Sequence, residues 1–301
     1  MMDYLNFYSL PEKTYINKLK ALSTKTLFKK KNVTYTILFI HENMIFTKNN
    51  NPFFFKTSEI SNDLYQLSLS FIARLKNNYY IMCNLKESDL KKLSFLKKGI
   101  YQNIREIIFN LKQDYASLLA AGYSLWSWQN NNYYCSKCGT KTKIADNGGS
   151  IICTNIKCKK KIFPIVYPTV IINVVYENKI LLARNRGWKE NLYSCLAGFC
   201  EQSESAEDAA RREVYEEVGL DLKKVNYKYS QYWPFTNNLM LGFEAMVNPK
   251  KNLININRQE IEKANWFTAK EIKHLYKNKK LILPKKEAIA FSLIQDWLKK
   301  N

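Results

Sequence analysis

Three glutamates at helical spacing constrain the fold of this chain more than any other feature. Glu213, Glu216 and Glu217 stand at positions i, i+3 and i+4, so a helix here carries three carboxylates on one face. Like charges on one face repel and destabilise an isolated helix. Hard cations against that face would explain the pattern, because Mg²⁺ and Mn²⁺ prefer carboxylate oxygens. The alternative is a solvated acidic helix, an unusual face in a chain of net charge +21.

The ends of this helix are marked in the sequence. Ser205, with Asp208 three residues later, is typical of a capping box, and Gly219 suits a helix C-terminus. We therefore predict a helix over 205–218. Arg212 adjoins the glutamates and is able to clamp a carboxylate by a bidentate pair. The face opposite the charges is predicted to pack on a sheet through Ala209, Val214 and Val218.

Residues Gly198 to Leu220 resemble the Nudix box, Gx₅Ex₇REUxEExGU with U aliphatic, at every fixed position. Nudix enzymes hydrolyse a nucleoside diphosphate linked to another moiety. The resemblance implies a Nudix α/β/α sandwich with a mixed sheet, and it makes Glu213, Glu216 and Glu217 the catalytic residues. Glu216 would act as a further metal ligand or as a proton acceptor.

The resemblance also implies a magnesium or manganese site. Glu213 and Glu217 would bind the ions, which neutralise the charge of a pyrophosphate and lower the pKa of a bound water. Two further ligands are implied: the backbone carbonyl of Ala197 and a downstream carboxylate. The carboxylate is assigned to Glu260, with Glu262 as the nearby rival.

A second motif narrows the resemblance to the NADH pyrophosphatase subfamily. The segment Ser230-Gln-Tyr-Trp-Pro-Phe235 is similar to that subfamily's SQPWPFP signature, with Tyr232 and Thr236 in place of two prolines. The order of parts also matches: a variable N-terminal region, a four-cysteine ribbon, then the box. Family members cleave NADH or NAD⁺ to nicotinamide mononucleotide and AMP. The alternative for this loop is an aromatic core turn.

The subfamily resemblance implies a set of substrate-binding residues. Phe199 would stack on a ring of the dinucleotide, and Phe163 stands where the family has a tyrosine. Ala290 matches a backbone contact. The residues that would wrap the nucleotide are Gln231, Tyr232, Trp233, Pro234, Phe235, Thr236, Asn237 and Asn238.

Four of the seven cysteines form two short pairs, Cys135/Cys138 and Cys153/Cys158. Such pairs converge on one tetrahedral Zn²⁺ in zinc ribbons. Four thiolates leave no open coordination position, so we predict one structural zinc per chain. The alternative is a set of free buried thiols. A ribbon of this kind can also bind nucleic acid, which the pattern alone does not establish.

The other cysteines and the chain start suggest a compartment. An odd cysteine count without a signal-like N-terminus favours a reducing intracellular compartment, such as the cytoplasm. We interpret Cys195 and Cys200 as small apolar residues. No apolar run approaches the ~20 residues of a spanning helix, so no membrane partner is expected.

Basic residues are dense in the ribbon, where residues 135–164 hold seven lysines and one aspartate. The whole chain has 47 Lys and Arg against 26 Asp and Glu. Such an excess is typical of proteins with partners such as nucleic acid, membrane surfaces or anionic substrates; we favour compositional drift, with attraction of polyanions as a by-product.

The chain is predicted to be α+β in three domains: an N-terminal α+β domain (1–130), the zinc ribbon (131–164) and the Nudix domain (165–301). In the first we predict a strand pair over 34–47, a polar helix over 85–98 and a long helix over 104–128. In the last we predict strands over 169–176, 180–184, 192–199, 227–233, 239–247 and 263–268, and helices over 205–218 and 288–298.

The favoured function is metal-dependent hydrolysis of NAD(H), in a homodimer as in the family. Two enzymatic alternatives stay open: removal of NAD caps from RNA 5′ ends, or action on another Nudix substrate such as ADP-ribose. A zinc-ribbon nucleic-acid-binding protein is the non-enzymatic alternative, and the complete set of box carboxylates argues against it.

Overall fold

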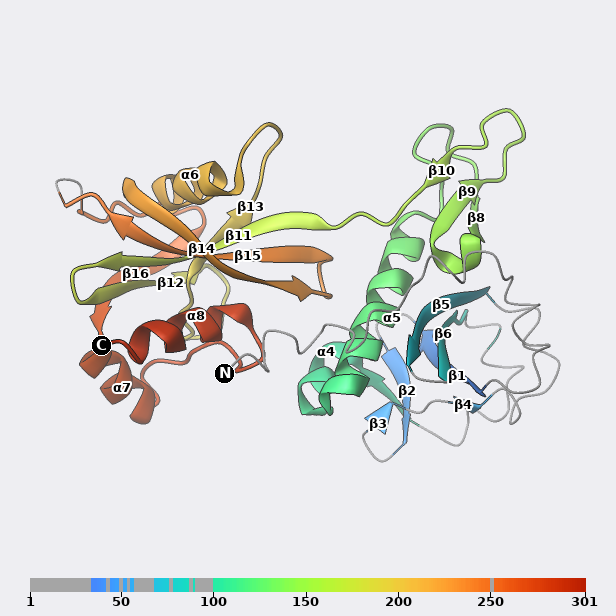
Figure 1. The fold of residues 1–301 in the computed structure, drawn as a ribbon, viewed down its shortest axis with the longest axis horizontal. Coiled ribbons are helices and arrows are strands. Elements are labelled where there is room, and N and C mark those ends of the chain that lie inside the picture. Colours follow the sequence, from blue (N-terminus) through green and yellow to red (C-terminus); the bar gives the residue numbers. More distant parts are fainter. Residues whose placement is uncertain are drawn as a thin grey trace. The chain divides into compact units, whose positions relative to one another are not determined.

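A computed structural model of the chain describes residues 34–41, 44–48, 51–52, 55–56, 68–75, 78–86, 89, 100–249 and 252–301. It divides into two compact units (Figure 1). The catalytic unit comprises Val166–Trp233 and Asn238–Asn301. The ribbon unit comprises the described residues up to Ile165 together with Pro234–Asn237. The predicted division into three domains stays a prediction.

A six-stranded mixed sheet forms the centre of the catalytic unit. Its order is β14-β15-β11-β12-β16, and β13 pairs with β11. β11 runs parallel to β15 and antiparallel to β12, which confirms the predicted mixed sheet. The strands are β11 (Tyr167–Tyr176), β12 (Lys179–Asn185), β13 (Leu196–Phe199), β14 (Leu222–Trp233), β15 (Asn238–Val247) and β16 (Ile261–Thr268).

Helices cover both faces of this sheet. α6 (Ala206–Val218) packs in one core with alternate residues of β11, such as Val170 and Ile172. α7 (Ala269–Lys277) and α8 (Ile289–Leu298) pack in a second core with Ile171. Since β-strand side chains alternate between faces, the apolar run of β11 contributes side chains to both cores. The sandwich predicted from the family resemblance is confirmed. The predicted sheet-facing residues of α6 are fully buried: Ala209, Val214 and Val218.

The predicted strand over 192–199 is wrong in its first half, because β13 begins only at Leu196. Leu192 forms a bridge with Ile282, whereas Ser194 forms one with Ala183. The segment before β13 is therefore tied to two different neighbours and cannot form one continuous ladder. The predicted strand over 227–233 begins earlier than expected, at Leu222.

Helix α7 was not predicted, although its start has a clear signal. The hydroxyl of Thr268 accepts a hydrogen bond from the N–H of Glu271, and the Glu271 carboxylate accepts one from the N–H of Thr268. This T-x-x-E pair is a capping box, recognisable in the sequence.

A second sheet lies in the ribbon unit, with the path β3-β2-β1-β6-β5 and with β4 and β7 attached to β1 and β2. β1 and β2 pair antiparallel, which confirms the predicted strand pair. The predicted helix over 85–98 falls almost wholly outside the described residues. The strands are β1 (Thr34–His41), β2 (Met44–Lys48), β3 (Asn51–Pro52), β4 (Phe55–Lys56), β5 (Ser68–Leu75), β6 (Asn78–Asn84) and β7 (Ile100–Asn103).

The predicted long helix over 104–128 is wrong as one element. It consists of α4 (Ile104–Ile107), a 3₁₀ turn η4 (Ile108–Asn110) and α5 (Gln113–Asn131). Leu111 and Lys112 between them are extended, with ψ of 155° and 148°. Past the break, Tyr115 is 39% exposed while Ala116 is fully buried. The predicted Leu118 and Leu119 are still buried, so Tyr115 alone departs from the predicted apolar face.

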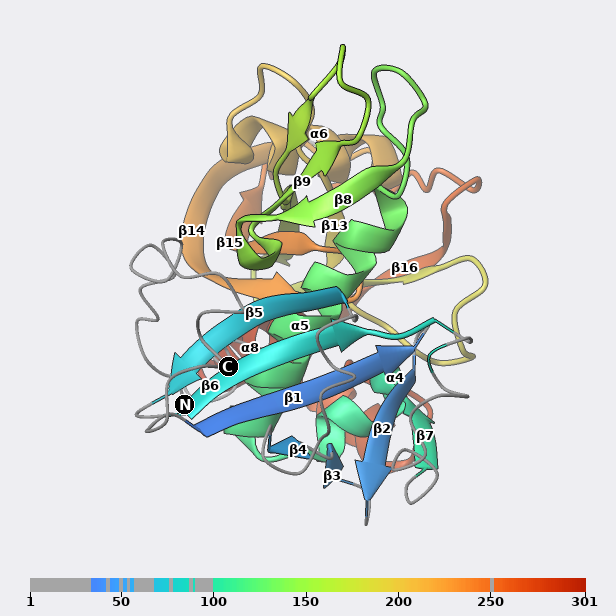
Figure 2. The ribbon, with the colours of Figure 1, turned by 90° about the vertical axis from the view of Figure 1, so that its right-hand side faces the viewer.

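Three short antiparallel strands form the ribbon: β8 (Thr142–Ala145), β9 (Ser150–Cys153) and β10 (Lys161–Ile162). They lie at the end of α5, where Trp128 packs with Ile151 and Ile162 (Figure 2). The ribbon thus shares a small apolar core with the helix that precedes it.

No helix among the described residues is long and apolar enough to cross a membrane.

Candidate functional site

Arg212 connects helix α6 to the loop that precedes it. Its Nε and Nη2 atoms donate to the two carboxylate oxygens of Glu204 at 2.6 and 3.0 Å. Nη1 donates to Glu213 at 3.0 Å and to Glu216 at 2.9 Å, and Nη2 also donates to the Phe199 carbonyl at 2.8 Å. The predicted bidentate pair is confirmed. Arg212 fixes the positions of three box carboxylates, because its planar fork binds Glu204, Glu213 and Glu216 at once.

Gly198 lets strand β13 approach the glutamates. A Cβ atom at this position would overlap the carboxylate of Glu213. Any larger residue would therefore displace the carboxylate or the strand. Glycine is required here for close approach, and the Ala197 carbonyl belongs to the same stretch of strand.

Glu217 is the most buried carboxylate of α6, with 3% of its surface exposed. Its Oε2 atom is buried and has no hydrogen-bond partner. Burial raises the pKa of Glu217 to about 8, and the charges of Glu213, Glu260 and Glu216 add to the effect. Burial also raises the pKa of Glu213, against the lowering effect of Arg212. A buried, unpaired carboxylate among other acids fits a divalent cation, which would satisfy the free oxygen and offset the repulsion.

The structure separates the two downstream candidates. Glu262 forms an ion pair with Arg184. The charge of Glu260, by contrast, raises the pKa of both Glu213 and Glu217. Glu260 is thus electrostatically coupled to the box glutamates, and its rival already has a cationic partner.

Two exposed aromatic rings lie beside each other at the edge of this site. Phe199 is 55% exposed and follows Gly198 directly. Tyr167, 49% exposed, meets it edge to face with ring centres 6.4 Å apart. Sequence reasoning missed Tyr167, although an aromatic residue just before the predicted strand over 169–176 was a usable signal. These rings offer apolar surface for stacking.

Gln231 and Asn238 are engaged with the protein. Gln231 is 2% exposed; its Nε2 donates to the Glu287 carbonyl and its Oε1 accepts from the Ile289 N–H, both at 2.8 Å. Gln231 therefore fixes the start of α8, where the predicted contact residue Ala290 lies buried. The Asn238 amide donates to the Thr169 hydroxyl at 2.7 Å.

Phe235 is a core residue of the ribbon unit. Its ring lies 6.0 Å from that of Phe109 and 6.1 Å from that of Tyr123. The Arg105 guanidinium lies 5.4 Å from the ring centre. This packing is the aromatic core turn that the sequence left open for the loop.

The other predicted substrate residues differ in exposure. Tyr232 and Trp233 are half-buried in the catalytic unit. In the ribbon unit, Pro234 is buried, Asn237 is half-buried, and Thr236 and Phe163 are exposed. Since the predicted set is divided between two units, its assembly into one site stays a prediction.

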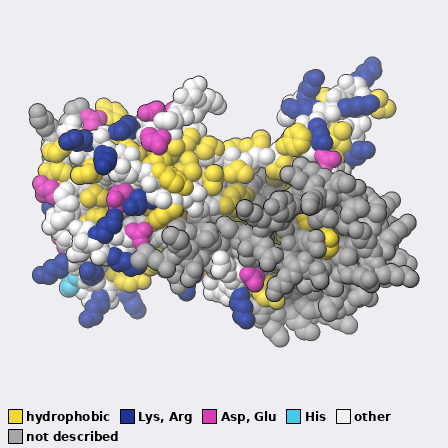
Figure 3. Space-filling view, in the orientation of Figure 1, with side chains coloured by type: hydrophobic (Ala, Val, Ile, Leu, Met, Phe, Trp, Pro, Cys, Tyr) yellow, Lys and Arg dark blue, Asp and Glu magenta, His cyan; other side chains and the backbone are white. Residues whose placement is uncertain are grey.

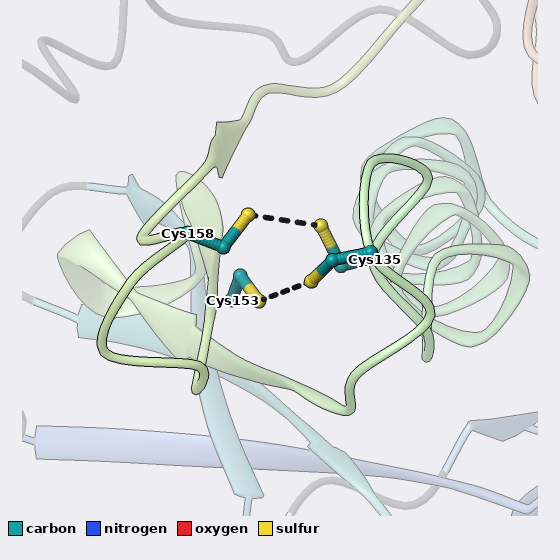
Figure 4. Close-up of side chains that lie close together, drawn as sticks. Cys135, Cys153 and Cys158 are labelled. Carbon is teal, nitrogen blue, oxygen red and sulfur yellow. Dashed lines mark hydrogen bonds between the residues drawn. The ribbon is translucent and has the colours of Figure 1, made fainter.

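The four predicted cysteines converge. Their sulfur atoms all lie within 4.8 Å of one another, and the Sγ–Sγ distances are 3.8 Å for Cys135–Cys158 and 3.4 Å for Cys138–Cys153. Figure 4 shows these side chains pointing toward one another. Across the described residues, no other set of three or more His, Cys, Asp or Glu is this tight. Four thiols at this separation form a group able to hold a metal ion.

Backbone N–H groups point at the sulfurs in the same way in both loops. The Lys137 N–H donates to Cys135 Sγ and the Asn155 N–H to Cys153 Sγ, each at 3.4 Å. Both loops thus begin as the same knuckle, although the second pair is spaced more widely. Such bonds favour the thiolate that binds a metal.

Each knuckle ends on a residue with positive φ. Gly139 follows Cys138 with a φ of 69°, and Lys159 follows Cys158 with a φ of 47°. Glycine takes this conformation freely, whereas lysine is strained in it. Hydrogen bonding between Cys138 and the side chain and backbone of Thr140 lowers the pKa of Cys138 to about 6. The wider second loop therefore closes like the first, at a conformational cost.

Cys195 is buried in the second core of the catalytic unit, and burial raises its pKa to about 12. This supports its interpretation as a small apolar residue.

Comparison with known proteins places these features in a family. Residues 166–288 match the model of the NUDIX domain. "NAD(P)H pyrophosphatase NUDT13, mitochondrial" of Mus musculus is 36% identical over 212 residues, 66% of this chain and 60% of that protein. "NAD-capped RNA hydrolase NudC" of Mannheimia succiniciproducens is 33% identical over 204 residues, 66% of this chain and 73% of that protein. "NAD-capped RNA hydrolase NUDT12" of Homo sapiens is 33% identical over 205 residues, 64% of this chain and 44% of that protein. The chain thus spans less than two thirds of the mouse and human relatives it matches.

Proposed function

The chain belongs to the Nudix hydrolases, in their NADH pyrophosphatase subfamily, and from this premise we propose that it hydrolyses the pyrophosphate bond of NADH or NAD⁺. The products would be nicotinamide mononucleotide and AMP. One structural observation carries the proposal: the Oε2 atom of Glu217 is buried without a hydrogen-bond partner, and the charges of Glu213, Glu216 and Glu260 act on this carboxylate.

We assign the cation site to Glu213, Glu217, Glu260 and the Ala197 carbonyl. When bound there, Mg²⁺ or Mn²⁺ supplies Lewis acidity that offsets the charge of the pyrophosphate. Burial keeps water away from Glu217, which strengthens its attraction for a cation. Arg212 holds the Glu213 side chain in place through a hydrogen bond.

Glu216 is suited to a different role. Its side chain is 53% exposed, and its carboxylate accepts one hydrogen bond from Arg212. An exposed carboxylate next to the cation site can accept a proton from the attacking water. Phe199, and Tyr167 beside it, would stack on a base or nicotinamide ring and so fix the position of the dinucleotide.

The four thiols have the donor set of a structural Zn²⁺ site, and we assign one zinc ion per chain to them. A reducing intracellular compartment would keep the thiols available to the metal. We further propose that the chain acts as a homodimer, as the family resemblance implies.

NAD-capped RNA is a second candidate substrate, favoured by the surface of the ribbon. All seven lysines of residues 135–164 are exposed, and Figure 3 shows basic side chains gathered over this region. The single acid, Asp146, is paired with Lys161 at 2.5 Å. A basic surface of this kind attracts the phosphates of a polynucleotide. Two relatives carry the name of this activity.

A substrate panel tests these proposals. Purified full chain would be assayed with NADH, NAD⁺, ADP-ribose and NAD-capped RNA, each with Mg²⁺ or Mn²⁺, and the products identified by mass. We expect nicotinamide mononucleotide and AMP from the dinucleotides. Turnover of ADP-ribose alone would move the assignment to another Nudix specificity. RNA binding without turnover of any substrate would support the non-enzymatic alternative. Light scattering would test the dimer.

A further inference from the structure

The ribbon unit contains a cavity of about 450 Å³ that the proposed chemistry does not use. Its wall is formed by the end of β6, the last turns of α5 and the ribbon strands β8 and β9. All of its lining residues belong to one compact unit, and none is a cysteine or one of the proposed catalytic residues. The volume lies within the range of ~300–1,000 Å³ that is typical of small-molecule sites.

The charges around this cavity are positive. Lys86 and Lys143 line it, and no acidic residue does. Lys141 lies close by, with its ammonium group 5.8 Å from the ring centre of Tyr133, which also lines the cavity. No ion pair within the described part of the chain involves any of these three lysines. The cavity therefore favours an anionic ligand.

A buried acceptor in the lining lacks a partner. Gln129 is 6% exposed, and its Nε2 atom donates to the Ser70 hydroxyl at 2.8 Å. Its Oε1 atom is buried without a hydrogen-bond partner. An unsatisfied buried carbonyl costs free energy that a ligand N–H would recover. The atom is closed off from the cavity as the protein stands, so a hydrogen-bond donor on the ligand would reach it once the Gln129 side chain turns toward the cavity.

The rest of the wall combines apolar side chains with the polar Asn84, Asn130 and Thr142. Trp126 lines the cavity and stacks on Tyr123 with ring centres 5.5 Å apart. The Trp126 indole N–H donates to the Asn84 side chain at 3.1 Å, and that side chain donates to Asn130 at 3.0 Å. Tyr133 and the ribbon add further apolar surface. Such a preorganised wall suits a flat heterocycle.

We propose that this cavity binds a nucleoside monophosphate. Lys86 and Lys143 pair with the phosphate, the apolar wall accepts the base, and the Gln129 carbonyl accepts a hydrogen bond from the exocyclic amino group of the base. The lining shares no residue with the proposed cation site, since all of it belongs to the ribbon unit and the glutamates of α6 belong to the catalytic unit.

The test uses the full chain and AMP as the probe. Calorimetry would measure the affinity for AMP. It would be done without added divalent cations, so that metal-dependent binding at the glutamates stays weak. Photolabelling with 8-azidoadenosine 5′-monophosphate, followed by peptide mapping, would locate the bound base. We expect label on peptides that carry Trp126, Tyr133 or Lys143. Label confined to residues 166–301 would overturn the proposal.

Paired variants test the phosphate contacts. The double variant Lys86→Ala/Lys143→Ala removes both cations, and we expect AMP affinity to fall at least about tenfold. The control Lys137→Ala/Lys157→Ala removes the same charge from exposed ribbon positions outside the lining, and should leave the affinity within about twofold. Equal losses in both would show attraction by net charge alone and would contradict the site.

Matched probes test the other two contacts. Adenosine, which lacks the phosphate, and purine riboside 5′-monophosphate, which lacks the amino group, should each bind several-fold more weakly than AMP. Inorganic phosphate binding as tightly as AMP would contradict the role of the base. Unchanged affinity for the probe without the amino group would contradict the contact to Gln129.

Discussion

The two proposed metal sites of this protein are built in opposite ways. The four thiols come from two loops whose backbone N–H groups already point at the sulfurs, and the sulfurs lie within 4.8 Å of one another. The glutamates come from one face of α6 and from the residue before β16, and Arg212 and Gly198 position them. One member, Glu217, is buried, while Glu216 is half exposed.

This difference separates a structural site from a catalytic one. Four thiolates complete a tetrahedral shell and leave nothing for substrate. A carboxylate set that is buried on one side and open on the other keeps positions for water and a phosphate oxygen. Damage to the first should therefore lower stability, and damage to the second should lower activity.

The largest expected effect is on activity. Glu217→Gln removes a cation ligand, and we expect turnover to fall about 10³-fold or more, since such a ligand contributes several kcal/mol to the transition state. Steady-state assays of the best substrate in the panel would measure this. Glu207→Gln, an exposed position in the first turn of the same helix, is the control and should keep near-normal turnover.

The same variant should not damage the fold. The raised pKa of Glu217 means that the folded state binds a proton more tightly than the unfolded state. Without divalent cations, stability then falls as pH rises from the ordinary value of 4.5 through about 8. At pH 9 we expect Glu217→Gln to melt at or above the temperature of the wild type. A clear loss of stability there would contradict the electrostatic description of the site.

Cys135→Ser should lower stability, in contrast to Glu217→Gln, which should lower activity and leave the fold intact. Loss of one thiolate weakens zinc binding, and we expect the melting temperature to fall by roughly 10 °C, with zinc content below one per chain. Calorimetry and metal analysis would measure both. Ser136→Ala, next to it in the same loop, should retain the zinc. Unchanged zinc content in Cys135→Ser would contradict the assignment of a zinc ion to the four cysteines.

Arg212→Lys tests how the glutamates are held. A lysine cannot bind Glu204 through two parallel bonds while also reaching Glu213 and Glu216, so we expect activity to fall about 10- to 100-fold. Arg211→Lys is the control, because Arg211 donates to the Leu222 carbonyl instead. Equal losses in both variants would mean that the effect comes from the helix in general.

The smallest expected effects are changes in the free energy of unfolding caused by substitutions in the two knuckles. Gly139→Ala should lower the free energy of unfolding by about 1–2 kcal/mol through its positive φ alone, since a new Cβ would contact nothing within 4 Å. Lys159→Gly should raise it by up to about 1 kcal/mol, because it relieves the same conformation. Denaturant titration with zinc bound would measure both. Shifts of the same sign would contradict the equivalence of the two loops.

Features set by local interactions could be predicted from the sequence. The helix with its capping serine, the convergence of the four cysteines and the bidentate Arg212 all depend on residues close in the chain. The prediction of one helix over 104–128 was wrong at Leu111, because the apolar spacing in the sequence continues across the break. The predicted start of β13 was wrong because the residues before it, Leu192 and Ser194, pair with two different neighbours elsewhere in the chain.

Sequence alone therefore determined the family, the metal-binding residue types and most elements, because spacing along a helix or knuckle fixes which side chains share a face. Only the tertiary structure favoured Glu260 over Glu262 as the candidate ligand, because Glu262 pairs with Arg184. It also gave Gln231 its place at the start of α8 and formed the cavity lined by Gln129. Each of these depends on contacts between residues far apart in the chain, whose partners no spacing rule specifies.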